Sequence, residues 1–288
     1  MKINKVLVTG SRGFIGKHLC KSLRENGIRV VTHGKERNKL DVTNLGKILT
    51  IEDVEAVVHL AAKTSILDSM KNPYQTYFTN IVGTLNLLEF ARIRNVRKFI
   101  YVSTYVYGQP QYLPIDEKHV VNPHSPYNRS KLLAEELCQN YSHDFGIDIV
   151  ILRPFYVYGP DSRDRSFIPS IIQQIKKNAI VELSGEQIKR DFLFVTDFVL
   201  LLQIILREFP NGYNIYNAGY GTSYSLKEVA QSLAKLLDRK IAIQSFKTNV
   251  DDISDMRADI TKVSKTFKWK PTVDIGKGLR LIVQESSN

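Results

Sequence analysis

Short apolar runs alternate with longer amphipathic segments through the first half of the chain. Runs rich in valine and isoleucine predict strands at residues 5–8, 29–32, 54–60, 98–103 and 147–152. Apolar positions at helical spacing between them predict helices at residues 16–26, 77–95 and 130–143. Continuously apolar strands are typical of a parallel sheet with helices on both faces. The pattern therefore predicts an α/β fold with a doubly wound parallel sheet, whose ligand site lies at the carboxyl ends of the strands.

The regular alternation of strands and helices stops after Arg153. Prolines interrupt the rest of the chain, and the remaining strand and helix patterns follow one another irregularly. We therefore expect two domains. Residues 1–153 form the first and carry most of the sheet, and residues 154–288 form a smaller mixed part interleaved with the last sheet strands.

The composition is that of a globular protein, with 43% hydrophobic and 24% charged residues. The longest apolar stretch, residues 198–206, contains Gln203 and is much shorter than the roughly 18 residues that a membrane-spanning helix needs. The first ten residues resemble a strand and a glycine turn, not a signal peptide. Cys20 and Cys138 lie in helical patterns, so we expect two buried thiols, no disulfide, no membrane partner and a cytoplasmic location.

The formal net charge of +11 raises the question of an anionic partner. Lysine and arginine are spread along the chain without a dense basic run, and the sequence lacks the aromatic, zinc-binding and recognition-helix patterns of nucleic-acid-binding proteins. We therefore expect no nucleic-acid partner and no metal site. A basic surface remains suited to drawing a polyphosphate ligand into a cleft.

A glycine-rich turn follows the first predicted strand and opens the first predicted helix. Its three glycines allow the tight turn, the approach of a pyrophosphate to the backbone, and close packing of helix on strand. The free N–H groups at the start of the helix then bind the phosphates. The cofactor residues expected in this turn are Gly10, Arg12, Gly13, Phe14, Ile15 and Gly16.

The end of the second strand bears on the choice of cofactor. NAD-binding sites usually place a carboxylate there for the adenosine 2′-hydroxyl, but residues 30–34 contain none. Lys35 and Arg37 follow, and Arg12 lies in the glycine turn, so cations are available for a 2′-phosphate. NADP(H) is therefore favoured, and NAD(H) remains possible if these are only loop charges. Further along, the residues expected near the adenine are Asp41 and Val42.

Tyr127 and Lys131 are spaced to share one face of a helix. The ammonium of Lys131 can lower the pKa of the Tyr127 phenol and hold a ribose hydroxyl, while the phenol exchanges a proton with a sugar oxygen. Ser103, at the end of a strand, supplies a hydroxyl for the same oxygen, and the adjacent Thr104 is the alternative. We expect Ser103, Tyr127 and Lys131 to be catalytic and Thr104 to contact the substrate.

The chain resembles the NAD-dependent epimerase/dehydratase family, the extended branch of the short-chain dehydrogenases, in its motifs and in their order. The resemblance spans nearly the whole chain. It is carried by TGSRGFIG (9–16), HLAA (59–62), NIVGTLNLLE (80–89), VSTYVYG (102–108), SPYNRSK (125–131), RPFYVYGP (153–160), RDFLFVTD (190–197) and WKP (269–271). It implies a Rossmann domain that binds NAD(P) in the first half, a nucleotide-sugar-binding second half, and often a homodimer with a four-helix interface.

The resemblance also implies roles for further residues. Asn80 would be an active-site asparagine, and Arg190 and Arg257 would face the diphosphate of the substrate. The alternative for Arg257 is a surface charge at a helix end. Cofactor contacts after the third strand would come from Leu60, Ala61, Ala62 and Lys63.

The residues that follow Ser103 reduce the number of reactions that the chain is expected to catalyse. Dehydratases of this family carry Asp-Glu directly after the catalytic hydroxyl, whereas this chain has Thr104 and Tyr105, so dehydration is not expected. Enzymes that epimerise carbons 3 and 5 carry a cysteine two places after the serine and a histidine before Ile-Pro. Here Tyr105 and Ser166-Phe167-Ile168-Pro169 stand there, so this activity is not expected either.

Three interpretations remain. The favoured one is NADPH-dependent reduction of a 4-keto nucleotide-sugar, because the second strand lacks a carboxylate and Arg12 lies in the turn. The second is 4-epimerisation with tightly bound NAD, favoured by the VSTYVYG, PIDE (114–117) and RDFLFVTD segments. The third, a cofactor-binding protein without catalysis, conflicts with the intact catalytic residues.

Overall fold

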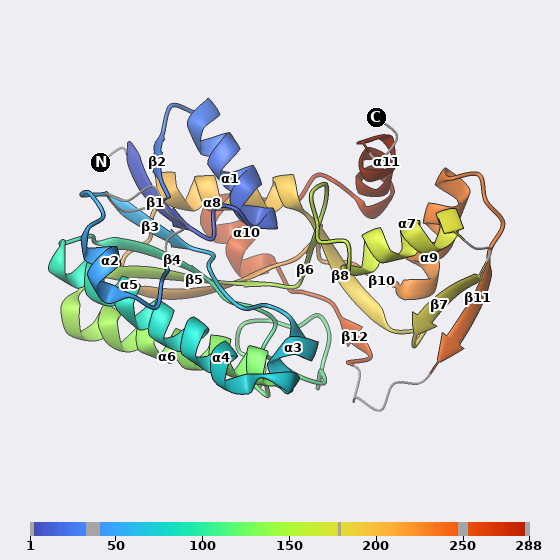
Figure 1. The fold of residues 1–288 in the computed structure, drawn as a ribbon, viewed down its shortest axis with the longest axis horizontal. Helices are drawn as coiled ribbons and strands as arrows, with labels where there is room; N and C mark the ends of the chain where they lie inside the picture. Colours follow the sequence, from blue (N-terminus) through green and yellow to red (C-terminus); the bar gives the residue numbers. More distant parts are fainter. Residues whose placement is uncertain (1–2, 33–40, 178–179, 247–252, 286–288) are drawn as a thin grey trace. The chain divides into compact units, whose positions relative to one another are not determined.

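The computed structural model describes residues 3–32, 41–177, 180–246 and 253–285 (Figure 1). They cluster into two compact units: unit 1 comprises 1–108, 121–154 and 199–216, and unit 2 comprises 109–120, 155–198 and 217–288. The chain passes between the units several times. The expected division at residues 153 and 154 stays a prediction about domains.

A six-stranded sheet of the order β2-β1-β3-β4-β5-β9 forms the centre of unit 1, and β1 to β5 pair in parallel. Its strands are β1 (Lys5–Thr9), β2 (Arg29–Val31), β3 (Ala56–His59), β4 (Lys98–Val102), β5 (Asp148–Pro154) and β9 (Tyr213–Ala218). The valine and isoleucine runs of β3, β4 and β5 are almost wholly buried because helices cover both faces. The expected α/β fold with a parallel sheet is confirmed.

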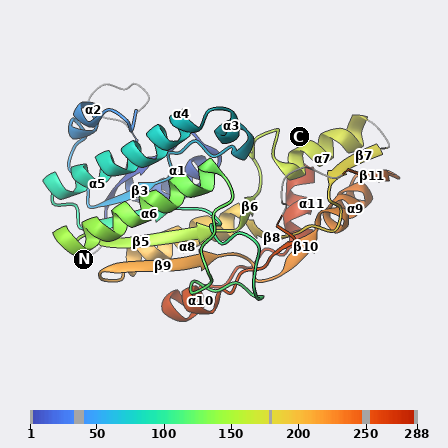
Figure 2. The same cartoon turned by 90° about the horizontal axis from the view of Figure 1, so that it is seen from below.

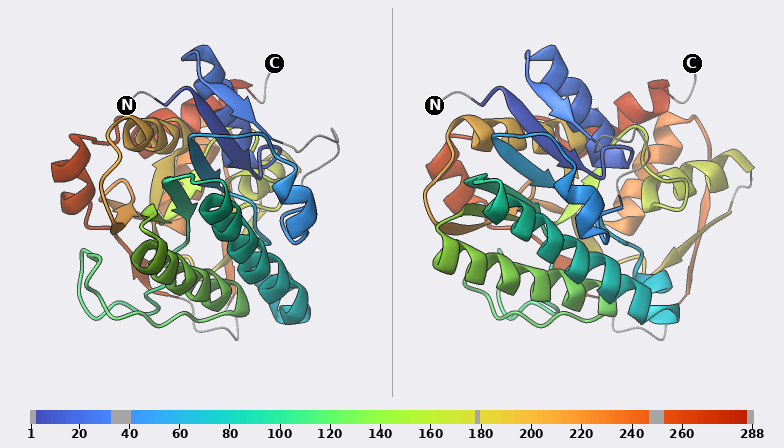
Figure 3. Two further views of the ribbon diagram at one scale, coloured as in Figure 1. Left: turned by 90° about the vertical axis from the view of Figure 1, so that its left-hand side faces the viewer. Right: turned by 60° about the vertical axis from the view of Figure 1, so that its left-hand side comes forward.

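Helices α1 and α8 lie on one face of this sheet, and α2, α5 and α6 lie on the other (Figures 1 and 2). The helices are α1 (Phe14–Glu25), α2 (Leu45–Leu49), α3 (Ile66–Lys71), α4 (Pro73–Tyr77), the π-helix η1 (Phe78–Val82), α5 (Gly83–Ile93), α6 (Pro126–Phe145) and α8 (Val195–Arg207). Both views of Figure 3 show α5 and α6 side by side, and the two helices are in contact. Cys20 on α1 and Cys138 on α6 are buried free thiols, as expected.

Two of the expected helices begin four residues earlier than their patterns indicate, and α1 begins two residues earlier, at Phe14. Helix α6 begins at Pro126 instead of residue 130, because proline fits the first helical position and the Ser125 side chain caps the helix by accepting from the Asn128 N–H. The helix expected at residues 77–95 begins at Pro73 and contains the π-helical turn η1.

Unit 2 is a smaller mixed assembly around β8. Strands β6 and β12 pair with β8 in parallel, β10 pairs with it antiparallel, and β7 and β11 form a separate parallel pair. Its strands are β6 (Tyr156–Tyr158), β7 (Ile180–Ser184), β8 (Lys189–Phe194), β10 (Ser223–Ser225), β11 (Ala242–Phe246) and β12 (Asp255–Met256). Its helices are α7 (Phe167–Lys177), α9 (Leu226–Leu236), α10 (Thr261–Phe267) and α11 (Ile275–Glu285).

The core of unit 2 consists of aromatic and branched side chains from β6, β8, α7 and α9. Among the described residues of both units, no helix is both long enough and apolar enough to cross a membrane.

Candidate active site

The glycine turn between β1 and α1 leaves no room for side chains at two of its positions. Gly10 has a φ of +68°, and a Cβ on it would lie 2.8 Å from the Ala61 nitrogen. A Cβ on Gly16 would lie 2.2 Å from the Gly10 oxygen, so only glycine lets α1 pack this closely on the turn. Gly13 is the N-cap of α1 and offers no side chain to its free N–H groups. The backbone therefore fits a pyrophosphate at the start of this helix.

The other residues expected at the cofactor lie at the carboxyl ends of neighbouring strands. Residues 60–63 follow β3, which pairs with β1, and the Leu60 and Ala61 N–H groups each donate to the Thr9 hydroxyl at 3.2 Å. Leu60, Ala61 and Ala62 are half-buried and Lys63 is exposed. In the turn, Arg12 is exposed, and Phe14 and Ile15 are half-buried. Their contacts with a cofactor stay a prediction.

The residues expected around the adenosine are described only in part. Lys35 and Arg37 lie outside the described residues. The Asp41 carboxylate accepts from the N–H and the hydroxyl of Thr43, at 3.0 and 2.8 Å, so its side chain forms a local turn. Val42 is buried, and its oxygen accepts from the Asn86 amide at 3.0 Å. An adenine contact by Asp41 or Val42 stays a prediction.

Tyr127 and Lys131 lie one turn apart in the first part of α6. Tyr127 is half-buried, and Lys131 is only 2% exposed. The Lys131 Nζ lies 4.0 Å from the centre of the Tyr101 ring on β4, a cation–π contact. Burial lowers the pKa of Lys131 to about 7, although the nearby Glu135 carboxylate opposes this shift. Lys131 is therefore poised to take up or release a proton near neutral pH.

The hydroxyl of Ser103, just after β4, donates to the buried carboxylate of Glu135 on α6. Glu135 also forms a buried ion pair with Arg153 on β5, whose Nη1 donates to the Tyr107 hydroxyl at 3.1 Å. Thr104 is half-buried. The expectations that Ser103 is catalytic and that Thr104 contacts the substrate stay predictions, and the structure adds that Glu135 holds the Ser103 hydroxyl.

Asn80 is buried in the π-helical turn, and both its amide nitrogen and its amide oxygen bond to protein partners. Its Oδ1 accepts from the Lys63 N–H at 2.8 Å, and its Nδ2 donates to the Lys63 oxygen at 3.0 Å and to the Ser130 hydroxyl at 2.9 Å. Ser130 donates in turn to the backbone carbonyl oxygen of Tyr127 at 2.7 Å. Asn80 therefore links the segment after β3 to the helix that carries Tyr127 and Lys131. A direct substrate contact by Asn80 stays a prediction.

A buried chain of hydrogen bonds joins the glycine turn to the same π-helical turn. The Thr9 hydroxyl accepts from two backbone N–H groups, so its proton goes to His59 Nδ1, 2.7 Å away. His59 Nε2 then carries the ring proton and donates to the Thr84 hydroxyl at 3.1 Å. The Thr84 hydroxyl donates to the backbone carbonyl oxygen of Asn80 at 2.6 Å. Burial, and then the charge of Lys131, hold the pKa of His59 well below its usual value, so the ring is neutral.

Sequence reasoning did not assign roles to Glu135, Arg153, His59 and Thr84. A signal for Glu135 was present, because it follows Lys131 by one helical turn on the same face. The partners of His59 and Thr84 come from three separate segments, and no local pattern indicates them.

Arg190 and Arg257 lie close together in unit 2, because β8 pairs Arg190 with Met256 of β12. The Arg190 Nη1 donates to the Lys189 and Ile253 oxygens, at 2.9 and 2.7 Å. The Arg257 Nε is buried and has no hydrogen-bond partner within the described part of the chain. An unsatisfied buried guanidinium N–H is unfavourable, so Arg257 is suited to receive an anion. A diphosphate contact by either arginine stays a prediction.

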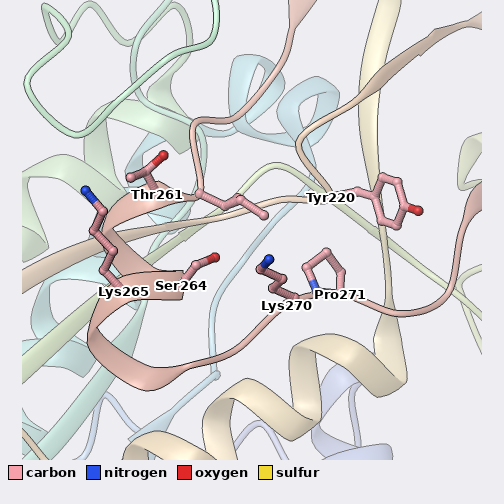
Figure 4. Close-up of a pocket in the computed structure, with 7 residues that line it drawn as sticks. Tyr220, Thr261, Ser264, Lys265, Lys270 and Pro271 are labelled. Carbon is pink, nitrogen blue, oxygen red and sulfur yellow. The ribbon is translucent and has the colours of Figure 1, made fainter.

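A pocket on unit 2 is lined by Tyr220, Ile260, Thr261, Ser264, Lys265, Lys270 and Pro271 (Figure 4). None of the expected site residues that the structure describes lines it. Lys265 and Lys270 are two cations on an otherwise mixed surface, and we assign no function to this pocket.

The chain was compared with known proteins. Residues 6–219 match the NAD dependent epimerase/dehydratase family. The chain is 32% identical to a putative UDP-glucose 4-epimerase of Methanocaldococcus jannaschii, with 98% of both chains covered. It is 31% identical to GDP-6-deoxy-D-mannose reductase of Pseudomonas aeruginosa, with 98% of this chain and 96% of the relative covered.

The fold is similar to the solved structure of RMD from Pseudomonas aeruginosa complexed with NADPH. The TM-score is 0.91 at 29% identity, with 99% of this chain and 100% of that chain covered. The family match, the relatives and the glycine turn agree, and the chain is an enzyme that belongs to the NAD dependent epimerase/dehydratase family of nucleotide-sugar epimerases and reductases.

Proposed function

We propose that the chain is an oxidoreductase that acts at C4 of the hexose of a nucleotide-sugar, and that it reduces a 4-keto sugar with NADPH. The observation that carries this proposal is the placement of Tyr127 and buried Lys131 on one turn of α6. The same helix is tied through Asn80 to the segment after β3, next to the glycine turn that fits a dinucleotide. NADPH, when bound, supplies the hydride that reduces C4.

The proton in this reaction comes from Tyr127. Its phenol donates the proton to the keto oxygen, which becomes the C4 hydroxyl, and the phenolate takes up a proton from solvent. The Lys131 ammonium stabilises the phenolate by its charge. The Ser103 hydroxyl turns away from Glu135 to donate a hydrogen bond to the keto oxygen. Before substrate binds, the Ser103 hydroxyl donates to Glu135, and the buried ion pair with Arg153 keeps the charge of Glu135 balanced when the serine turns to the sugar.

The preference for NADPH is supported by two features of this chain and by one solved structure of similar fold. Residues 30–34 contain no carboxylate for a 2′-hydroxyl, and Arg12 is an exposed cation in the glycine turn. Arginine binds phosphate in a bidentate manner, which favours the 2′-phosphate of NADPH. The solved structure of similar fold from Pseudomonas aeruginosa also contains NADPH.

A second candidate is 4-epimerisation with tightly bound NAD(H). It is favoured by the 32% identity to a putative UDP-glucose 4-epimerase over nearly the full length. An epimerase keeps its cofactor and returns the hydride to the other face of the sugar, so Tyr127 would both remove and return the proton.

One assay separates the two candidates. The purified protein is incubated with a panel of nucleotide-sugars and 4-keto nucleotide-sugars while the nicotinamide absorbance is recorded and the products are identified. Stoichiometric loss of NADPH with a 4-keto sugar supports the reductase. Interconversion of two hexoses without net change in the cofactor supports the epimerase and contradicts the reductase, and cofactor binding without turnover on any substrate contradicts both.

We also propose that the protein is a homodimer that associates through α4, η1 and α6. Tyr74 and Phe78 stack with their ring centres 6.0 Å apart and are 70% and 38% exposed, and Leu133 on α6 is 42% exposed. Helices α4 and α6 are in contact, and we infer that these exposed side chains lie on one apolar face. Light scattering coupled to gel filtration tests this: the wild type should be a dimer and Tyr74→Glu with Leu133→Glu a monomer. A monomeric wild type at micromolar concentration contradicts the proposal.

A further inference from the structure

The carboxylate of Asp191 on β8 is buried and accepts hydrogen bonds from three backbone N–H groups. They belong to Tyr220, to Gly221 at 2.9 Å, and to Ala258 at 3.0 Å. Within the described residues no cationic side chain pairs with it. A buried carboxylate without a cation is costly, and burial raises the pKa of Asp191 to about 6. The three N–H donors compensate for its burial, so Asp191 is bonded to residues 220–221 and 258 at the same time.

The hydrogen bonds of Asp191 fix the peptide group that follows Arg257. The N–H of this peptide, on Ala258, donates to Asp191, and its C=O, on Arg257, accepts from the Ile115 N–H at 2.8 Å. Both polar atoms of the peptide are therefore held, one from β8 and one from the segment around Ile115. This leaves the Arg257 backbone little freedom to rotate.

The packing around the carboxylate is equally restricted. A Cβ on Gly219 would lie 2.9 Å from Asp191 Oδ2 and 2.5 Å from the Ala258 Cβ, so only glycine fits between them. The segment 219–221 and the Ala258 backbone therefore both pack against and bond to the Asp191 carboxylate. Loss of its charge would loosen both segments at once.

We propose that Asp191 is a positioning residue for an anion site at Arg257: it holds the Arg257 peptide so that the guanidinium is preorganised for the diphosphate of a nucleotide-sugar. This inference rests on the proposed function, because it takes Arg257 as the group that binds the diphosphate. The Arg257 Nε, buried and without a partner in the described residues, is the donor that the diphosphate would satisfy. Preorganisation lowers the entropy lost on binding, so Asp191 acts on affinity without touching the ligand.

The same β8–α8 segment provides a matched control in Asp197. This buried carboxylate also accepts two backbone N–H groups, from Thr272 and Val273 at 2.9 Å each, and the Thr272 hydroxyl at 3.0 Å. Its partners do not include the Arg257 peptide. Asp191→Asn and Asp197→Asn therefore remove the same kind of buried acceptor. Only Asp191→Asn removes a hydrogen bond to the Arg257 peptide at the proposed anion site.

Titration calorimetry of the full chain with UDP-glucose, GDP-mannose and dTDP-glucose tests the proposal. For the nucleotide-sugar that binds best, we expect Asp191→Asn to lower the binding affinity by tenfold or more. Asp197→Asn should change this affinity by less than twofold. Thermal denaturation of both variants measures the damage to the fold. Equal weakening in the two variants, or wild-type affinity in Asp191→Asn, overturns the positioning role.

The pH dependence of nucleotide-sugar affinity is a second test, because a purely structural role of Asp191 would not change it. The doubly esterified diphosphate of a nucleotide-sugar does not titrate between pH 5 and 8, so a change in affinity reports the protein. Protonation of Asp191 replaces an acceptor by a hydroxyl, so wild-type affinity should fall as the pH drops through about 6, and Asp191→Asn should show no such fall. The titratable groups acting on Asp191 from neighbouring strands are Asp255 of β12 and Tyr224 of β10. A pH profile shared by wild type and Asp191→Asn contradicts the proposal.

Arg257→Gln separates this inference from the proposed function. If this variant binds nucleotide-sugars like the wild type, or if the wild type binds none of the three, the assignment of Arg257 to the diphosphate fails and the inference fails with it. If Arg257→Gln loses binding and Asp191→Asn does not, only the positioning role of Asp191 is overturned.

Discussion

The Ser103 hydroxyl donates to the carboxylate of Glu135, one helical turn beyond Lys131 on α6. Glu135 is paired with Arg153 at the same time, and both side chains are almost completely buried. The carboxylate of Glu135 on α6 therefore contacts both the Ser103 hydroxyl after β4 and the Arg153 guanidinium on β5. The geometry at Ser103 depends on this buried ion pair.

The first prediction concerns that pair. Glu135→Gln leaves the Arg153 guanidinium buried without a counter-charge, so we expect the free energy of unfolding to fall by about 3 to 5 kcal/mol. Urea denaturation measures it. The neighbouring Glu136 is exposed, and Glu136→Gln should change stability by less than about 0.5 kcal/mol. Equal stability of the two variants would show that the pair is not needed.

The second prediction concerns the buried ammonium of Lys131, whose pKa is lowered to about 7 by burial. Below pH 7 the folded and unfolded chains both carry this charge, and the cost of burying it is complete. As the pH rises from about 7 to about 10, the folded chain loses the proton while the unfolded chain keeps it, so the cost is relieved. Lys131→Met should therefore be more stable than the wild type by up to a few kcal/mol near pH 6, and this difference should shrink at pH 9.

The measurement is thermal denaturation without cofactor at both pH values. Lys21, exposed on α1, gives the control, since Lys21→Met should show no comparable pH-dependent gain. A Lys131→Met variant that is less stable than the wild type at pH 6 would contradict the account of this charge. The same variant should lose turnover, because it can no longer stabilise the phenolate of Tyr127.

The third prediction concerns the chain of hydrogen bonds through His59. Thr84→Val preserves the shape of the side chain but leaves the His59 Nε2–H buried without an acceptor, so we expect a loss of about 1 to 3 kcal/mol. Thr76 is the matched control, because it is also buried and, among the residues the structure describes, its hydroxyl bonds only to the Asn72 backbone oxygen one turn back, at 3.2 Å. Denaturation of both variants should show the larger loss for Thr84→Val, and an equal loss would remove the case for the chain.

The fourth prediction concerns the choice of cofactor. Arg12→Ala removes the exposed cation of the glycine turn, so NADPH binding should weaken about tenfold more than NADH binding. Fluorescence titration with both cofactors measures the ratio. Arg12→Lys retains the charge without the bidentate geometry and should lie between wild type and Arg12→Ala. Equal losses for the two cofactors would leave no support for a 2′-phosphate site at Arg12.

Much of the sheet and of the cofactor turn could be predicted, because both depend on local sequence. The valine and isoleucine runs of β1, β3, β4 and β5 fix buried parallel strands, and the glycine spacing fixes the turn. The start of α6 was placed too late because the helical pattern begins after its cap, although Ser125 and Pro126 are themselves helix-start signals. The π-helical turn at residues 78–82 is not visible in the apolar spacing.

Within the candidate site, proximity could be predicted for residues that share one helix and not for residues that meet across the fold. Tyr127 and Lys131 are neighbours on α6, so their spacing was sufficient. The contact of Ser103 with Glu135, and that of Asp191 with Ala258, join segments far apart in the sequence. In the sequence, no local pattern distinguishes the polar residues that form such contacts from other polar residues.

The central claim is that Tyr127 moves the proton during reduction at C4 of a nucleotide-sugar. The most direct test is NADPH oxidation by Tyr127→Phe with the 4-keto nucleotide-sugar that the wild type reduces, alongside NADPH binding by the same variant. The account predicts that turnover falls on the order of a hundredfold or more while the affinity for NADPH changes little. Turnover equal to that of the wild type would contradict the claim.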